Sequence, residues 1–335
     1  MESWRTIGII MLAMLLLAGI AFCASAVYGM MKLSSYRSPF GFLIIYKCIA
    51  TTFILLILLL WAVPCYIWQF DVSYKLINAR VGMLIMLFNT AVYMENAVIS
   101  ASRMISVVVP SKTRCFSIRN VKLILLLVSI TSVLNSLLYY QDSCWIFFNS
   151  TTLLLDISNT YCGQILSFYG DFVFGVTIFT ASFIMDIISI VSLRKMRKKV
   201  ANTISVNMNK QRYHKELLMT VQVFINTTLC YIMLCSYHIF SDWLEVSPLM
   251  TFLTTNFLWC FVLASGGFTA IMLNNEIRRI LIYPLGISLK KVFLTKDQAE
   301  EGGFTKPMTS FHMNGARAGF IRSANDPNHF CPITA

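Results

Sequence analysis

Five polar residues recur along one otherwise apolar stretch, at spacings of four, three, four and three. They are Asn89, Tyr93, Asn96, Ser100 and Arg103. This spacing places all five on one face of an α-helix. An arginine turned toward lipid costs at least about 2.5 kcal/mol, so the face is predicted to lie against a protein interior or a cavity. The amide and hydroxyl groups of Asn89, Tyr93 and Asn96 make them candidate contacts for a small molecule.

Further polar residues lie toward the same end of three later apolar stretches. Asp171 is a lone carboxylate there, and an ionisable group inside a membrane helix is costly and typical of a functional site. The others are Tyr237, His238, Asn256 and Trp259. Each of these types taken alone is more common as interior packing than as a ligand contact. Together they are predicted to line one pocket.

Glu95 lies about 100° around the helix from the polar stripe. It is either a ligand contact or a protonated carboxyl bonded to a neighbouring helix. We favour the second interpretation, because burial disfavours the charged form of a carboxyl group.

The sequence does not support an enzyme. The histidines are His214, His238, His312 and His329, and they form no zinc-ligand pattern; no GxSxG motif or phosphate-binding loop is present. Asp171 and Asp186 are 15 residues apart, about 22 Å along a helix, and are too distant for a catalytic pair. We therefore expect no catalytic residues, no cofactor and no metal site.

The elements that must position these residues are apolar helices. The chain has 335 residues, 57% of them hydrophobic, and a mean hydropathy of +0.69, which is too much apolar surface for one water-soluble core. A bilayer needs about 20 apolar residues for each helix. The stretches that meet this length are 7–31, 41–67, 81–109, 121–140, 164–193, 217–240 and 249–273. The predicted fold is an all-α bundle of seven transmembrane helices within residues 1–290.

The distribution of charge predicts the orientation of the bundle. The net charge is +12, but the basic residues are segregated by membrane side: three lie in the segments that would be outside and twenty-two in those that would be inside. This bias places the N-terminus outside and the C-terminus in the cytosol, and it argues against nucleic-acid binding. The segment 275–283 is predicted to be a short amphipathic helix on the membrane. Residues 291–335 are polar and rich in glycine and proline, and are predicted to be a disordered cytosolic tail.

The loop 141–163 carries two kinds of covalent chemistry. Cys144 and Cys162 are 18 residues apart and would face the oxidising side, where a disulfide could hold the loop over a pocket mouth. Two free thiols, or a bond from either one to Cys65, remain alternatives. Asn149 begins an Asn-Ser-Thr sequon and is a candidate glycosylation site.

Several strings, in their order and spacing, resemble nematode serpentine chemoreceptors of class x over residues 8–285. They are Ser38-Pro39-Phe40-Gly41-Phe42, Leu60-Trp61-Ala62-Val63-Pro64, the spacing of Arg103 to Pro110, Phe168-Tyr169-Gly170-Asp171-Phe172 after Cys162, and Asn274-Asn275-Glu276-Ile277-Arg278-Arg279. The resemblance implies a rhodopsin-like G-protein-coupled receptor in the plasma membrane of sensory neurons, which detects environmental chemicals and signals through a heterotrimeric G protein.

Candidate residues for G-protein coupling lie at the cytosolic ends of the helices. They are Arg103, Pro110, Arg194, Lys195 and Arg197. The simpler interpretation is that the basic residues set the topology and hold anionic lipid, and that Arg103 anchors its helix end by reaching the headgroups.

The chain also departs from the wider rhodopsin-like pattern. Ser102 stands before Arg103 where many such receptors have an acid, the sixth helix lacks a proline, and Ser265-Gly266-Gly267-Phe268 replaces an Asn-Pro motif in the seventh. A seven-helix ligand-gated channel and a transporter are the alternatives. The charge bias opposes the channel, whose topology is inverted, and paired broken helices of a transporter are not evident. The sequence leaves the ligand and the oligomeric state open.

Overall fold

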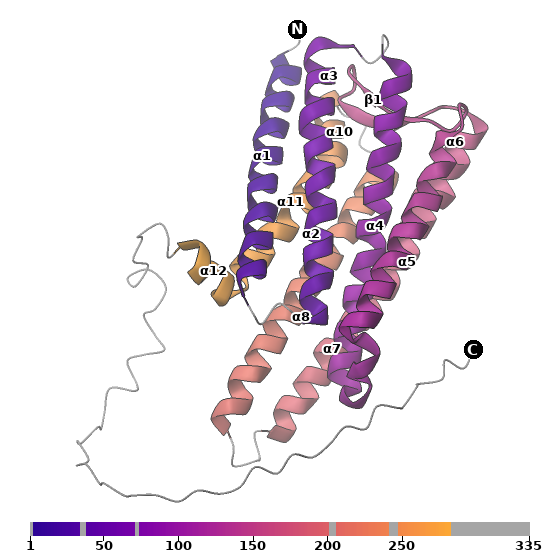
Figure 1. Ribbon diagram of the computed structural model, residues 1–335. Coiled ribbons are helices and arrows are strands. Elements are labelled where there is room, and N and C mark those ends of the chain that lie inside the picture. The colour runs from indigo at the N-terminus through magenta and orange to yellow at the C-terminus, as the bar shows by residue number, and fades with distance from the viewer. Residues whose placement is uncertain (1–2, 34–37, 71–73, 201–205, 241–246, 283–335) are drawn as a thin grey trace, which may run out of the picture. The chain divides into compact units, whose positions relative to one another are not determined.

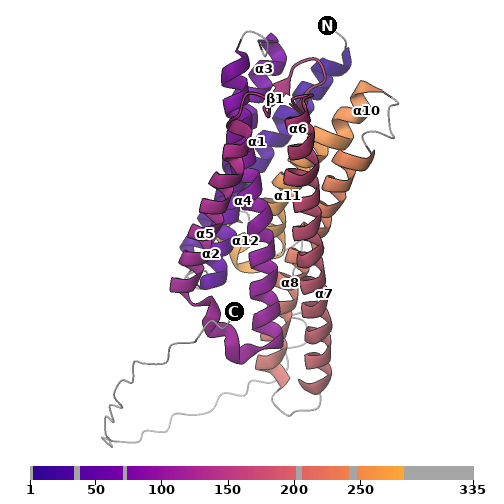
Figure 2. The same ribbon diagram turned by 90° about the vertical axis from the view of Figure 1, so that its right-hand side faces the viewer.

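The structure is a computed structural model that describes residues 3–33, 38–70, 74–200, 206–240 and 247–282. Seven of its helices are long and apolar enough to cross a membrane, and they run side by side as one bundle (Figures 1 and 2). This confirms the predicted seven-helix class. The spans are Trp4–Lys32, Pro39–Trp68, Lys75–Val108, Ile118–Tyr140, Tyr161–Met196, Glu216–Ile239 and Pro248–Met272.

Three spans are single α-helices: α1 (Ser3–Lys32), α4 (Lys75–Val108) and α5 (Ile118–Leu137), the last ending in a 3-10 turn. The helices extend beyond several predicted ranges. The third begins at residue 75 instead of 81, the fifth continues to residue 200 as α7 (Phe174–Val200), and the sixth begins at residue 206 as α8 (Val206–Cys235). Hydropathy marks only the apolar part of a helix, whereas backbone hydrogen bonds continue into its polar ends.

Four helices begin at a serine or threonine that caps free backbone N–H groups. The hydroxyls of Ser38, Ser117, Thr160 and Ser247 each accept a hydrogen bond from the backbone N–H three residues later. Proline follows directly after two of them, as Pro39 and Pro248, where its missing N–H costs nothing. Local sequence therefore determines where these helices start.

The other four spans are interrupted by π-helical turns. In the second, Leu58–Ala62 separates α2 (Pro39–Ile57) from α3 (Val63–Trp68). In the fifth, Leu166–Val173 lies between α6 (Tyr161–Ile165) and α7. In the sixth, Ser236–Phe240 ends α8, and in the seventh, Leu253–Phe257 lies between α10 (Pro248–Phe252) and α11 (Leu258–Met272). All four turns lie toward the end of the bundle that carries α3, α6 and α10 (Figure 1). Single π-helical turns of this kind are common at functional sites.

The loop between the fourth and fifth spans folds into a β-hairpin, which the sequence analysis did not anticipate. Strand β1 (Ile146–Asn149) pairs antiparallel with β2 (Leu154–Ile157), with Ile146 opposite Ile157 and Asn149 opposite Leu154. Phe148 and Leu153 are fully buried. Their burial shows that the hairpin inserts into the mouth of the bundle, so we call this the hairpin end.

Helix α4 lies at the centre of the bundle and contacts α2, α5, α7, α8 and β1. Its predicted polar stripe is buried along its whole length, which confirms that it faces the interior. A short helix, α12 (Asn275–Ile282), follows α11; the Asn274 side chain caps it, and its Ile277 packs against Gly29. The predicted disordered tail, 291–335, lies outside the described residues.

Candidate functional site

A pocket lies directly beneath the hairpin and contains about 430 Å³ of space free of protein atoms, including its open mouth. Four transmembrane spans and both strands contribute to it. Its lining is Met86, Asn89, Tyr93, Ile146, Leu155, Ile157, Asp171, Met233, Leu234, Tyr237 and Trp259. The mixture of apolar walls with a few polar groups resembles the lining of small-molecule sites.

Five of the eight residues predicted as ligand contacts line this pocket. They are Asn89, Tyr93, Asp171, Tyr237 and Trp259. The other three are elsewhere in the bundle: His238 lies beside Asp171, Asn256 bonds to the hairpin, and Asn96 lies farther along α4. The structure thus divides the predicted set into five residues that face the pocket, two that contact its walls (His238 and Asn256), and Asn96, which lies away from it.

The carboxylate of Asp171 is held by a histidine from the neighbouring helix. His238 Nε2 lies 3.1 Å from Asp171 Oδ2, and the two side chains are 12% and 15% exposed. Both residues belong to π-helical turns, Leu166–Val173 and Ser236–Phe240. The Phe172 ring packs against the imidazole with centroids 4.9 Å apart. The irregular turns therefore bring an acid and its partner together at the pocket wall.

Side chains from four spans fasten the backbone of the hairpin. The Asn78 amide donates to Phe148 O at 2.8 Å and accepts from Phe148 N at 3.1 Å. Asn256 Nδ2 donates to Leu153 O at 2.8 Å, and the Tyr237 hydroxyl donates to Leu155 O at 2.6 Å. Arg5 Nη2 donates to Ser150 O at 2.8 Å. These hydrogen bonds hold the hairpin in place over the pocket, so we call the hairpin (146–157) the roof of the pocket.

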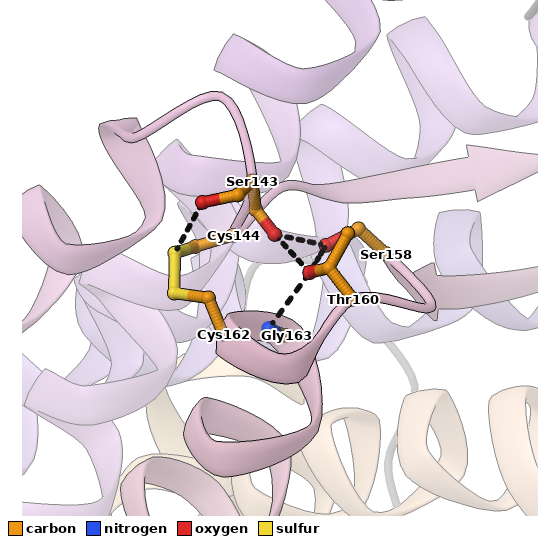
Figure 3. The surroundings of a disulfide bond; sticks show 6 residues. All are labelled: Ser143, Cys144, Ser158, Thr160, Cys162 and Gly163. Carbon is orange, nitrogen blue, oxygen red and sulfur yellow. Dashed lines mark hydrogen bonds between the residues drawn. A yellow bond between two sulfur atoms is a disulfide. The ribbon is translucent and has the colours of Figure 1, made fainter.

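A disulfide ties this roof to the start of the fifth span. Cys144 and Cys162 are bonded, with their Cα atoms 5.2 Å apart, whereas Cys65 is buried in the bundle and takes no part (Figure 3). The carbonyl of Ser143 accepts hydrogen bonds from the hydroxyls of Ser158 and Thr160 beside it. The loop is thus closed both covalently and by hydrogen bonds.

The sequon asparagine, Asn149, lies at the end of β1. Its Nδ2 donates to Asp156 Oδ2 at 2.7 Å, and its Oδ1 accepts from the Thr151 hydroxyl at 2.6 Å. Burial raises the pKa of the Asp156 carboxyl, and the hydrogen bonds from Asn149 and Thr152 oppose that rise. The sequon therefore also shapes the tip of the hairpin.

At the opposite end of α4, Arg103 is enclosed by other helices. Its Nη1 lies 2.8 Å from Glu216 Oε2 on α8, and its Nη2 donates to Met219 Sδ at 2.9 Å. The guanidinium carbon lies 3.2 Å from the centroid of the Phe40 ring. The Arg103 side chain is 6% exposed and that of Glu216 is 37% exposed. The arginine thus points into the bundle and does not extend toward headgroups.

Sequence reasoning missed Glu216. It noted that the acid usual beside this arginine is replaced by Ser102. The available signal was a single acid at the start of the sixth apolar stretch, directly after a run of basic residues. Among the other coupling candidates, Pro110 begins a 3-10 helix, Pro110–Phe116, and Arg194 and Lys195 are exposed on α7. The Arg197 side chain lies outside the described part.

Between the two ends, the bundle holds a polar centre. Lys47 Nζ donates to Asn96 Oδ1 at 2.5 Å, and Asn96 Nδ2 contacts Cys230 Sγ at 3.8 Å. The Thr227 hydroxyl donates to Asp186 Oδ2 at 3.0 Å. Glu95 is fully buried, and neither of its carboxyl oxygens bonds to any residue that the structure describes. Apart from Glu95, these groups form contacts among α2, α4, α7 and α8 between the pocket and Arg103.

Within the described ranges, no group of three or more His, Cys, Asp or Glu side chains could hold a metal ion.

Comparison with known proteins agrees with this architecture. No curated protein matches the chain. The family model described as serpentine type 7TM GPCR chemoreceptor Srx matches residues 14–274, which include all the residues of the pocket and both members of the Arg103–Glu216 pair. The chain therefore belongs to the Srx family of serpentine seven-transmembrane chemoreceptors.

Proposed function

We propose that this protein detects a small environmental chemical in the pocket beneath the hairpin and signals to a heterotrimeric G protein from the Arg103 end. In this proposal the hairpin end faces outside, and the protein acts in the plasma membrane of sensory neurons. Membership of a chemoreceptor family and the bias of basic residues toward the other end support it.

The observation that carries the proposal is that the same two helices serve both ends. Helix α4 supplies Asn89 and Tyr93 to the pocket and Arg103 to the ion pair. Helix α8 supplies Met233 and Leu234 to the pocket and Glu216 to the ion pair. A ligand that contacts both helices in one arrangement more favourably than in another would shift the population of receptors with the ion pair broken.

Once released from Glu216, the Arg103 guanidinium would offer its donors to a partner. It carries five N–H groups in a fixed geometry and stays charged, so it suits backbone carbonyls of an inserted G-protein segment. Exposed basic residues on α7, among them Arg194 and Lys195, would border the same surface.

The test is signalling by the full-length chain in cells that contain or lack a functional G protein. Arg103→Ala is expected to abolish signalling, and Arg103→Lys to weaken it because lysine keeps the charge but loses the fork of donors. Arg119→Ala, which removes an exposed arginine at the same end, is the matched control and should signal normally. Full responses from both Arg103 variants at normal surface level would refute this mechanism.

A further inference from the structure

The pocket has an uneven charge lining that restricts the kind of ligand it can take. Asp171 is its one ionisable acid, and the described lining contains no lysine or arginine. A ligand carboxylate or phosphate entering the pocket would lose its hydration without gaining a cationic partner. Anionic ligands are therefore disfavoured.

Asp171 keeps one oxygen for a ligand. Among the described residues it bonds through Oδ2 to His238 Nε2, and Oδ1 takes no hydrogen bond from them. When His238 is the neutral donor, the pair retains a charge of −1 at the pocket wall. Burial removes part of the hydration that stabilises the Asp171 carboxylate. A cation bound beside Asp171 would replace that stabilisation by direct electrostatic attraction.

A second acceptor lies on the facing helix. Asn89 is 5% exposed and lines the pocket, and its Oδ1 has no hydrogen-bond partner in the described part of the chain. A buried acceptor without a donor is costly, typically about 1–3 kcal/mol. A ligand that brings an N–H donor removes that cost, whereas an anion or an ether does not.

The rest of the lining suits the body of such a ligand. Tyr93, Tyr237 and Trp259 present aromatic rings, whose faces attract ammonium groups. Aliphatic and thioether side chains from the hairpin and α8 complete the wall, among them Leu155 and Met233. We propose that the ligand is a small protonated amine with an apolar body, whose ammonium group binds Asp171 and donates a hydrogen bond to Asn89 Oδ1.

This inference rests on the proposed function for the pocket but is tested without signalling. The full-length protein is purified in detergent, and its thermal stability is measured against matched probes that differ only in the polar group. One set is benzylamine, benzyl alcohol and benzoate; the other is isoamylamine, isoamyl alcohol and isovalerate. The amines are expected to raise the melting temperature most, the alcohols to raise it less because they can donate to Asn89 Oδ1 but bring no charge to Asp171, and the carboxylates to leave it unchanged.

Variants assign the contacts. Asp171→Asn preserves volume and hydrogen bonding to His238, and should weaken amine binding about tenfold or more. Asp142→Asn removes an exposed carboxylate just before β1, outside the pocket lining, and is the control, with binding unchanged. Asn89→Leu should weaken binding of benzylamine but not of benzyltrimethylammonium, which has no N–H to donate.

Three outcomes would overturn the inference. They are stabilisation by alcohols or carboxylates to the same degree as by amines, no stabilisation by either amine, and amine binding that Asp171→Asn leaves intact. The proposed function fails separately. Amine binding without G-protein signalling would refute the coupling but not the ligand class. Signalling evoked only by acids or neutral compounds would refute the ligand class but not the coupling.

Discussion

Replacing Glu216 by glutamine should make the receptor signal without ligand. The substitution keeps the length and volume of the side chain and removes the negative charge that faces Arg103 Nη1 at 2.8 Å. Arg103 would retain its contacts with Phe40 and Met219, so the helix end should stay packed. The change therefore weakens one link between α4 and α8 without deleting buried volume.

The burial of the two side chains determines the size of the effect. A charge-assisted hydrogen bond contributes about 1.5–3 kcal/mol when shielded, whereas fully exposed ion pairs contribute about 0.2–1 kcal/mol. The Arg103 side chain is 6% exposed but that of Glu216 is 37% exposed, so water partly screens the pair. We therefore take the contribution of the ion pair to the resting arrangement as about 1 kcal/mol. A shift of that size changes an equilibrium about fivefold. An active state that is about 1% populated at rest would rise to about 5%.

The assay is ligand-independent G-protein activation in cells, normalised to receptor at the surface. Glu216→Gln should raise this basal signal severalfold and leave the maximal response unchanged, and Glu216→Ala should do at least as much. Arg103→Ala combined with Glu216→Gln should be silent, because in the proposed mechanism the released arginine engages the G protein. Asp142→Asn, an exposed acid near the opposite end, is the control.

Two results would refute the reasoning. A basal signal equal to that of the unchanged protein would show that the pair does not restrain the resting arrangement. A lower maximal response with a normal basal signal would show that Glu216 contacts the G protein and does not hold Arg103.

Three further predictions concern the hairpin end. Cys144→Ser and Cys162→Ser should lower surface level or response alike, with the double variant no worse than either; a closed loop of this size is worth about 3 kcal/mol, and strictly additive losses would contradict a shared bond. Asn78→Leu leaves both polar groups of Phe148 unpaired, so the melting temperature should fall and ligand should dissociate faster; unchanged dissociation would show that the roof does not depend on this amide. An epitope at Ala335 should be stained only after permeabilisation, and Asn149→Gln should abolish a glycosidase-sensitive mass shift; staining of intact cells would reverse the proposed orientation.

The seven helices were predictable because their signal is local. Each apolar stretch is long enough to cross a bilayer, and four serine or threonine caps mark where helices start. The burial of the α4 stripe followed from the cost of polar groups in lipid, which does not depend on the partner helix. A pattern within one segment was sufficient for both predictions.

The contacts of the site were not predictable in the same way, because they join residues far apart in the chain. Arg103 and Glu216 are separated by 113 positions, and Asn78 and Phe148 by 70. Asn256 was predicted as a ligand contact because it is a polar residue in the outer half of the seventh helix. In the structure its amide donates to the carbonyl of Leu153 in the hairpin, and the pattern of a helix does not indicate such a contact. The hairpin itself was not predicted, because the sequence analysis treated residues 141–163 only as a loop with two cysteines and a sequon.

The π-helical turns make the sixth and seventh helices irregular without the usual proline positions. The sixth helix has no proline, yet its described part ends in the π-helical turn Ser236–Phe240, and the seventh is interrupted at Leu253–Phe257. The Ser236 hydroxyl donates to Thr254 O at 2.7 Å and so joins the two turns. A π-helical turn replaces the i→i−4 hydrogen bonds of an α-helix by i→i−5 bonds, and such turns are frequent at functional sites. In the proposed mechanism we expect the pair of turns to adapt locally beside Asp171 and Tyr237, and the continuous helix α8 to carry the resulting displacement to Glu216.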